Sequence, residues 1–399
     1  KNKKAGGMLV YGIPSFKLEK DVVEAEIDVM RQMGVDIKTG VEVGKDITND
    51  ELKKLGYNAL YLSICCQGSS MSAVDVLKEA GSTHEFPLEG DVGVIGGGNV
   101  AIDVARTSTR VGDYNVSMFC LEDRANMPAS EEEIEEAVEE GVKLDCGWGP
   151  KEILTENGKV TGIVLKRCTS VKDADGRFNP QYDENDTKTV KCSHVFLSIG
   201  QTTIWGDLLK GTKVEIDGVR VKADKLTYQT TDPDVFIGGD VYTGPRFAID
   251  AIAAGKEAAI SIHRYVQPHS SLTIGRNRRD FIELDKNNIK VESYDNSSRQ
   301  IPGTDNSYDH KKSFRDAKLT FTEEQVKAET ARCLGCGASV VDPNKCIGCG
   351  ICTTKCEFDA IHLNRDLPEC STMRKSEDKL KYILPYGAKQ AIKIKFKKK

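Results

Sequence analysis

The chain has 399 residues, of which 39% are hydrophobic and 29% charged, and its formal net charge is −5. This composition is typical of a globular protein with two or three domains, and the charge gives no reason to expect binding to nucleic acid. No apolar run is long enough to span a bilayer, and the first residues do not resemble a signal peptide, so we expect a cytoplasmic protein that does not bind membranes.

The N-terminal part of the chain reads as a helix followed by strands. Apolar side chains near helical spacing predict an amphipathic helix over residues 18–34, and residues 35–43 read as a strand. A second, apolar strand is expected at residues 57–64. Residues 91–112 predict a strand that turns through glycines into a helix.

A strand at residues 115–121 and a helix at residues 130–141 come next. Ser130 and Glu133 have the spacing of a capping box, in which each side chain binds the other residue's backbone N–H. Strands that alternate with helices indicate an α/β fold with a parallel sheet.

The pattern changes at residues 151–192, where the turn sequences ENGK and DADG predict an antiparallel ribbon. Strands at residues 194–200 and 234–240 and a helix at residues 246–266 return to the α/β pattern. Residues 267–320 are polar with few apolar runs and predict a linker that lies on a surface.

The sequence VIGGGNVA places Gly96, Gly98 and Ala101 in the G-x-G-x-x-A spacing of a dinucleotide-binding turn. Such a turn needs a tight bend at the first glycine, no side chain at the second, where a pyrophosphate approaches, and a small residue where helix meets strand. The expected strand before the turn and helix after it supply the required context, and a helix N-terminus favours phosphate groups. We therefore predict a nicotinamide dinucleotide site.

The end of the next strand bears on the choice between NAD and NADP. Glu122 or Asp123 stands where a carboxylate would accept hydrogen bonds from the adenosine ribose hydroxyls and repel a 2′-phosphate. Arg124 follows them and could bind such a phosphate. The sequence favours NAD and leaves NADP open.

The thirteen cysteines fall into two groups. The first group lies in or beside apolar strand-like runs, where thiols usually act as small core residues: Cys65, Cys66, Cys120, Cys146, Cys168 and Cys192. The second group follows a helix-like segment at residues 322–333 and predicts a metal-binding module: Cys333, Cys336, Cys346, Cys349, Cys352, Cys356 and Cys370.

The run CIGCGICTTKC has the cysteine spacing that bacterial ferredoxins use to hold 4Fe-4S clusters, with Glu357 in place of the usual proline after it. Cys346, Cys349 and Cys352 are expected to share one cluster. The fourth cysteine of such a run binds the other cluster in two-cluster ferredoxins, so Cys356 would join the pair of cysteines in RCLGCG.

Seven cysteines are one short of the eight that two complete clusters need. Cys370 either completes one cluster, with a different ligand or three irons at the other, or it is unused and only one cluster is complete. The alternative is a tetrahedral zinc site formed by the two C-x-x-C pairs, which leaves Cys352 and Cys356 without a role. His362 is read as a surface or core residue rather than a ligand.

Five stretches resemble the small subunit of glutamate synthase and its relatives in the pyridine nucleotide–disulfide oxidoreductase superfamily. They are GGMLVYGIPSFKLEKDVV, VIGGGNVAIDVARTSTRVG, NMPASEEEIEEAVEEGV, VFLSIGQT and TTDPDVFIGGDVYTGPRFAIDAIAAGKEAA, in the family's order. The resemblance implies two interleaved Rossmann-like dinucleotide-binding domains, one for FAD and one for the nicotinamide nucleotide, with a small ferredoxin-like iron–sulfur domain at the C-terminus.

The resemblance also implies boundaries and site residues. The FAD-binding domain would comprise residues 1–80 and 195–266, and the NAD(P)-binding domain residues 85–194, followed by the linker at 267–320 and the iron–sulfur domain at 321–399. Carried over by position, FAD would contact Gly200, Gly239, Asp240, Gly244, Pro245 and Ala248. The nicotinamide nucleotide would contact Gly96, Gly98, Asn99, Ala101, Glu122 and Arg124.

The chain departs from the family pattern at four points. The family's glycine fingerprint for the ADP part of FAD, N-terminal to Gly6, is absent, so the chain is a fragment, a half-enzyme completed by another polypeptide, or a protein with a compromised FAD site. A Gly-x-Pro-Gly-Glu element usual after LSICCQG is missing, and Cys65 replaces a glycine close to the flavin. Leu121 and Glu122 stand where many NADPH-using members have adjacent arginines, which again favours NAD.

Nicotinamide nucleotides carry two electrons as hydride and clusters carry one, so a flavin is needed to join them. We therefore expect an FAD-containing NAD(P)H oxidoreductase subunit that exchanges electrons with ferredoxin or other redox subunits, in one variant within an electron-bifurcating complex of anaerobes. No catalytic acid or base is predicted. The alternatives are a non-catalytic electron-wiring subunit with an incomplete flavin site, and the glutamate synthase small subunit itself, which carries its cluster cysteines at the N-terminus instead.

Overall fold

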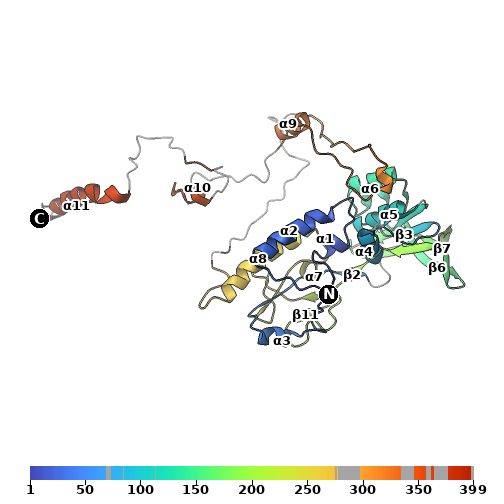
Figure 1. Ribbon diagram of the computed structural model, residues 1–399, viewed down its shortest axis with the longest axis horizontal. Helices are drawn as coiled ribbons and strands as arrows, with labels where there is room; N and C mark the ends of the chain where they lie inside the picture. The colour runs from blue at the N-terminus through green and yellow to red at the C-terminus, as the bar shows by residue number, and fades with distance from the viewer. Residues whose placement is uncertain are drawn as a thin grey trace. The chain divides into compact units, whose positions relative to one another are not determined.

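The computed structural model describes residues 1–68, 73–83, 85–112, 114–274, 276, 297–333, 346–355, 361–363 and 376–396. The chain forms two compact units, Lys1–Ala331 and Arg332–Lys399 (Figure 1). Among the described residues, no helix combines the length and the apolar character that crossing a bilayer requires.

The centre of the first unit is a four-stranded parallel sheet in the order β5-β4-β3-β9. Its strands are Lys143–Cys146, Val116–Cys120, Val92–Ile95 and His194–Leu197. Every residue of β3 is buried, as expected for an inner strand that is covered on both faces. The predicted α/β fold with a parallel sheet is therefore confirmed.

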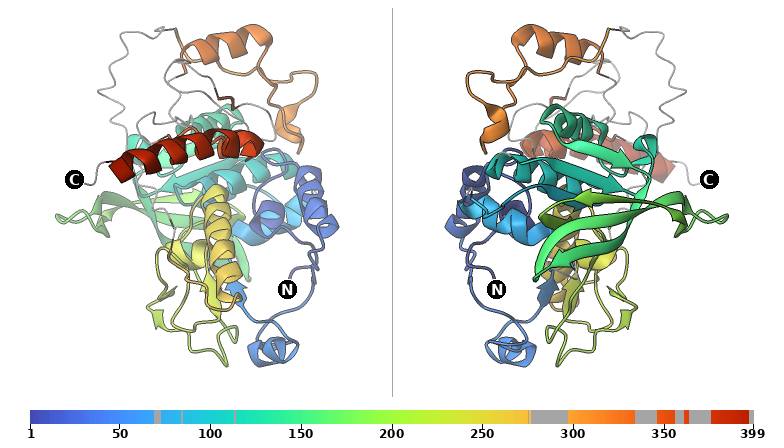
Figure 2. Two further views of the ribbon diagram at one scale, coloured as in Figure 1. Left: turned by 90° about the vertical axis from the view of Figure 1, so that its left-hand side faces the viewer. Right: turned by 90° about the vertical axis from the view of Figure 1, so that its right-hand side faces the viewer.

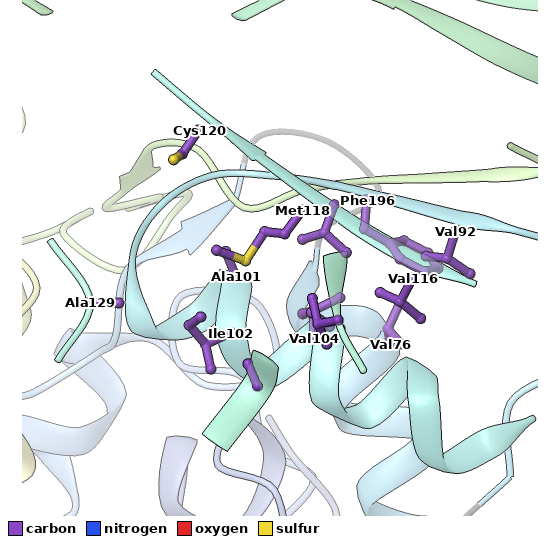
Figure 3. Packing of buried hydrophobic residues seen from close by; sticks show 14 of the residues in the cluster. Val76, Val92, Ala101, Ile102, Val104, Val116, Met118, Cys120, Ala129 and Phe196 are labelled. Atoms are coloured by element: carbon purple, nitrogen blue, oxygen red, sulfur yellow. The ribbon is translucent and has the colours of Figure 1, made fainter. Parts of the chain in front are cut away.

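Helices cover one face of this sheet. They are α4 (Ala73–Thr83), α5 (Asn99–Val111) and α6 (Glu131–Glu139). Figure 3 shows side chains from both layers meeting in this core, among them Val92, Val116, Met118 and Phe196 from the strands and Ala101, Ile102 and Val104 from α5. Because successive strand residues face opposite sides, the neighbouring residues Ile95 and Phe119 pack into a different cluster on the other face.

That other face is covered by an antiparallel ribbon, which confirms the hairpin pattern predicted for residues 151–192. Its strands are β6 (Trp148–Glu156), β7 (Lys159–Lys172) and β8 (Phe178–Lys191). Asn157 and Gly158 both have positive φ at the first turn, as a two-residue hairpin loop requires. Ile163 and Leu165 of β7 are fully buried against the sheet, while the far end of the ribbon extends beyond it (Figure 2).

The rest of the first unit is built around a pair of parallel strands, β1 (Leu60–Leu62) and β13 (Val235–Ile237). Val235, Phe236 and Ile237 are completely buried. The remaining elements here are α1 (Met8–Tyr11), α2 (Lys20–Gln32), α3 (Asn49–Lys54), β2 (Gln67–Gly68), β10 (Gln201–Thr202), β11 (Ile216–Asp217), β12 (Arg220–Val221), α7 (Asp240–Thr243) and α8 (Ala248–Tyr265).

The strand predicted at residues 35–43 is wrong. The segment has no ladder, and its one β-contact is an isolated bridge between Val43 and Ile47. Val35 and Val41 are exposed, and Gly40 has a φ of 74° that an extended strand does not allow. Apolar alternation alone does not make a strand when no neighbouring strand pairs with it.

The capping box predicted at Ser130 is also wrong. The Ser130 side chain makes no cap hydrogen bond, and its backbone N–H donates instead to Asn99 Oδ1 at 2.9 Å. Glu133 is drawn away by the ammonium group of Lys17, whose Nζ lies 2.7 Å from Glu133 Oε1. A capping box does form at the start of α3, between Thr48 and Glu51.

The described part of the predicted linker contacts the helices. Residues 310–312 form the short helix η2, and Arg110 Nε donates to the Ser313 carbonyl at 3.0 Å. The Lys318 ammonium pairs with Glu132 at 2.6 Å and with Glu136 at 2.9 Å, both on α6. The predicted helix at 322–333 is confirmed as α9 (Glu323–Ala331).

Three elements are described in the second unit. They are α10 (Ile351–Lys355), η3 (Ser376–Asp378) and α11 (Lys379–Phe396).

Candidate functional site

The glycine turn between β3 and α5 has the geometry that its sequence predicts. Gly96 has a φ of 143°, and a Cβ atom there would lie 2.7 Å from the Ser198 carbonyl oxygen, so no other residue fits without a shift. Gly98 precedes α5 with an ordinary φ of −95°, and no atom of the described residues lies within 4 Å of the position that its Cβ would occupy. Ala101 is completely buried where the helix meets the sheet.

The turn therefore leaves open space at the N-terminus of a thirteen-residue helix. Gly98 is the N-cap residue of α5, and among the described residues no side-chain hydrogen bond caps this end of the helix. Unpaired amides and the helix dipole favour an anion at such a terminus. The turn thus fits the pyrophosphate of a dinucleotide.

Glu122 lies beside the glycine turn. Its Oε2 atom is 2.9 Å from the position that a Cβ on Gly97 would occupy, and its carbonyl accepts a hydrogen bond from the Gly147 N–H at 2.9 Å. Sequence reasoning missed Gly97, although the unbroken run of three glycines could have indicated that its middle position is crowded too. The carboxylate is held at the C-terminal edge of the sheet, where ligands of open α/β folds bind.

The two other charged candidates for ribose or phosphate binding, Asp123 and Arg124, already bind other residues of the chain. The Asp123 carboxylate accepts hydrogen bonds from the backbone N–H and the side-chain amide of Asn126, and so caps the short helix η1 (Arg124–Asn126). Arg124 forms a fork with Glu131, with Nη1 2.9 Å from Oε2, and this hydrogen bond raises the pKa of Arg124 and lowers that of Glu131. Glu122 is thus the candidate whose carboxylate faces the turn.

The Asn99 side chain hydrogen-bonds to a neighbouring loop. Its Oδ1 atom accepts the Ser130 N–H at 2.9 Å, and the Gly97 carbonyl accepts the Ala129 N–H at 3.1 Å. These bonds fix residues 127–130 against the glycine turn. Sequence reasoning did not place Ala129 or Ser130 beside the glycine turn, because Asn99 and Ser130 are 31 residues apart in the chain.

The residues predicted for FAD gather after β13. Gly239 has a φ of 75° and precedes α7, which begins at Asp240. Asp240 Oδ1 accepts the Arg246 N–H at 3.3 Å, which ties the turn at Gly244 and Pro245 to the start of α8 at Ala248. Gly200, with a φ of 65°, lies elsewhere in the sequence, just before β10.

Two thiols lie beside this turn. The Cys66 Sγ atom is 3.7 Å from Thr203 Oγ1 and 4.0 Å from the Asp240 carbonyl oxygen. Burial is the main cause that raises the pKa of Cys65 and Cys66, and the negative charge of Asp240 adds to it. Both thiols therefore stay protonated near neutral pH.

The cysteine module is described only in part. Cys333, Cys346, Cys349 and Cys352 are exposed, and Cys336, Cys356 and Cys370 lie outside the described residues. Gly348 and Gly350 have φ values of 65° and 76°, which let the chain wind between successive cysteines. Within the described ranges no three potential ligands stand close enough to bind a metal. The donor set of thiolates nevertheless matches what an iron–sulfur cluster requires.

A cavity of about 250 Å³ lies between α5, α6 and residues 304–318. Two of its three arginines, Arg106 and Arg110, are paired with Glu140 at 2.7 Å and 2.6 Å. Because these charges already satisfy one another and the cavity is at the C-terminal half of α5, we assign it a structural role rather than nucleotide binding.

Asp103 is a buried carboxylate on α5 next to this cavity. Burial raises its pKa to about 6, although the Lys17 ammonium, 2.8 Å away, opposes the shift. An unfolded aspartate titrates near 4, so between about pH 4 and pH 6 the folded chain holds a proton that the unfolded chain has lost. The stabilising contribution of this group is present below pH 4 and disappears as the pH rises to 6.

We therefore expect the thermal unfolding midpoint of the parent chain to fall between pH 4 and pH 6 through this group, and we expect Asp103→Asn to lack that fall. Thermal unfolding of both proteins over this range measures the difference. Asp91→Asn, at an exposed carboxylate, serves as the control. Parallel pH profiles for the parent and Asp103→Asn would contradict the expectation.

Comparison with known proteins gives two family matches. Residues 64–255 match the model of pyridine nucleotide-disulphide oxidoreductases, and residues 339–362 match that of the 4Fe-4S binding domain. The second match contains the run from Cys346 to Cys356. The predicted iron–sulfur module is thereby supported as a 4Fe-4S binding domain.

Relatives cover most of the chain. It is 31% identical to the beta subunit of the NADP(+)-dependent formate dehydrogenase of Moorella thermoacetica, over 83% of this chain and 50% of that protein. It is also 31% identical to the “Putative glutamate synthase (NADPH) small chain” of Cereibacter sphaeroides, over 66% of this chain and 69% of that one. The chain thus spans about half the length of the first relative.

The fold has a match among solved structures. FprA of Mycobacterium tuberculosis, in complex with NADPH, aligns with a TM-score of 0.52 at 15% identity, over 65% of this chain and 75% of that one. The two proteins share the fold. Taken with the family model and the identity to the glutamate synthase small chain, the chain belongs to the pyridine nucleotide-disulphide oxidoreductases.

Proposed function

We propose that this chain binds NAD(H) and FAD and passes electrons between them and its own 4Fe-4S module. The observation that carries the proposal is the presence in one chain of an open glycine turn at Gly98 and a ferredoxin-type run of cysteines. A bound flavin would supply the exchange between hydride and single electrons. The relatives are named as beta subunits or small chains of redox enzymes, which supports a role as one subunit of a larger complex.

The residues of this chain position the groups rather than transfer protons. Gly96, Gly98, Asn99 and Ala101 shape the pyrophosphate end of the nucleotide site. Gly239, Asp240, Gly244, Pro245, Ala248 and Gly200 would hold FAD at the end of β13. The four cysteines Cys346 to Cys356, with Cys333, Cys336 and Cys370, would bind one or two clusters, and we favour two.

Additional protein is proposed to complete the FAD site. Within the described residues, β1 and β13 form a sheet of two strands, whereas the nucleotide sheet has four. Two strands alone make a marginal platform, so further strands from another polypeptide segment would extend this sheet and cover the flavin. Ferredoxin or another redox subunit would then exchange electrons with the clusters.

We propose that the nucleotide is NAD rather than NADP. Glu122 faces the turn and would repel a 2′-phosphate, while Arg124 is held by Glu131. The formate dehydrogenase and glutamate synthase relatives carry NADP or NADPH in their names, so on this point the proposal differs from them.

Glu122→Gln tests this preference. Losing one charge-assisted hydrogen bond to the ribose should weaken NADH binding about tenfold, and the NADPH affinity should fall less or rise. Titration calorimetry of both nucleotides measures the change, with Glu156→Gln at an exposed position as the control. Tighter binding of NADPH than of NADH by the parent chain would overturn the preference.

A further inference from the structure

A buried thiol and a half-buried thiol lie side by side beneath the glycine turn. Cys120 and Cys146 are directly opposite in the register of β4 and β5, and each is the last residue of its strand. Paired residues in neighbouring parallel strands point to the same face, and here both pack into the core beneath the helices. Both are free thiols.

The spacing suits a covalent bond between the two sulfur atoms. Neighbouring strands lie about 4.8 Å apart, which falls inside the range of Cα separations found in disulfides, about 4.4–6.8 Å. The proximity of Cys146 is also among the causes that raise the pKa of Cys120, after burial. Because both strands end at these cysteines, a small movement that brings the two sulfur atoms together does not break the hydrogen bonds between the preceding residues of β4 and β5.

The Cys120 side chain also touches the parts that form the nucleotide site. Its Sγ donates to the Glu122 carbonyl at 3.5 Å, and its Cβ lies 3.0 Å from the position that a Cβ on Gly97 would occupy. Cys146 Sγ is 3.9 Å from Met127 Sδ, on the loop that Asn99 and Gly97 hold. A change at Cys120 therefore reaches Glu122 and the glycine turn directly, and a change at Cys146 reaches the turn through the loop at Met127.

We propose that Cys120 and Cys146 are a modification site that closes to an intrachain disulfide by exchange with a small-molecule disulfide. The half-buried Cys146 thiolate attacks a sulfur of the reagent and releases one thiol, and Cys120 then displaces the second thiol from the mixed disulfide. The reagent is reduced by two electrons to two thiols, which take up the two protons that the cysteines lose. Burial raises the pKa of both cysteines, so the exchange is slow.

The disulfide removes the hydrogen bond from Cys120 to the Glu122 carbonyl. This consequence depends on the proposed function, because it matters only if Glu122 binds the ribose of NAD(H). We expect the NADH dissociation constant to rise about fivefold on oxidation and to recover on reduction.

The test uses the full chain, incubated anaerobically with oxidised glutathione, alkylated and digested with trypsin. Mass spectrometry should find the peptide of residues 111–124 joined to that of residues 144–151, a link that Cys146→Ser abolishes and Cys192→Ser retains. Cys192 is a suitable control because it is buried in the cluster on the opposite face of the sheet. Full alkylation of both Cys120 and Cys146 after prolonged incubation would overturn the proposal.

Calorimetry with NADH then separates the two claims. If the link forms and NADH affinity is unchanged, the effect on Glu122 is wrong while the modification site stands. If the reduced chain binds neither NADH nor NADPH, the proposed nucleotide site fails, and the peptide link still decides the modification site.

Discussion

Gly98→Val should abolish NADH binding while leaving the chain folded. The backbone at Gly98 has a φ of −95°, which a valine adopts readily, and the space around the missing side chain is empty. The new side chain would occupy the place where the pyrophosphate approaches the helix N-terminus. We expect a loss of at least about a hundredfold in affinity, since the phosphate contacts would be lost together with the steric fit.

Calorimetry with NADH and circular dichroism measure the two halves of this prediction. The matched control is Gly387→Val on α11, another glycine with φ outside the left-handed region and nothing near its Cβ position. Gly96→Val makes a second comparison, because its positive φ and the nearby Ser198 carbonyl predict loss of folding as well. Unchanged NADH binding by Gly98→Val would show that the nucleotide lies elsewhere.

Cys349→Ser should remove one 4Fe-4S cluster. A serine hydroxyl is a poor replacement for a thiolate ligand, and Cys349 is the middle cysteine of the three expected to share a cluster. Iron and acid-labile sulfide should each fall by about four per chain, and electron transfer to a one-electron acceptor should fall by at least about a hundredfold.

Elemental analysis and anaerobic spectroscopy of the reduced protein check this result. Cys168→Ser is the control, because its thiol is buried on the ribbon and its Sγ contacts the Ser170 carbonyl. Equal iron contents in parent and Cys349→Ser would mean that the run does not bind the cluster as proposed.

The glycine turn and its flanking strand and helix could be predicted from the sequence because the residues that determine them are close together in the chain. A strand, a turn and a helix occupy the continuous segment 92–111, and the spacing of Gly96, Gly98 and Ala101 fixes how they connect. The hairpin turns of the ribbon are equally local. Each depends on one or two residues with positive φ, such as Asn157 and Gly158.

The two wrong predictions concern segments whose structure depends on residues far away in the sequence. The capping box at Ser130 fails because Lys17, far away in the sequence, binds Glu133. The strand predicted at 35–43 does not form because, among the described residues, no strand pairs with this segment. The pairing of Cys120 with Cys146 was not predicted for the same reason. The sequence of a single strand does not determine which residues of the neighbouring strand it pairs with.

The choice between candidate carboxylates also needed the structure. Sequence placed Glu122 and Asp123 equally well after the strand, and the fold separates them, because Asp123 caps η1 while Glu122 reaches the glycine turn. The burial of Asp103 and its pairing with Lys17 were likewise invisible, since both depend on how the N-terminal segment packs on α5.

The most direct test of the account is the cofactor content of the chain purified under anaerobic conditions. We predict iron and acid-labile sulfide in equal amounts, about four or eight of each per chain, with no zinc, and FAD released on denaturation wherever the segment proposed to complete the FAD site is present. Iron without flavin would mean that this chain does not hold FAD without the additional strands proposed above. Zinc in place of iron would contradict the central claim that this chain joins a nicotinamide nucleotide to iron–sulfur chemistry.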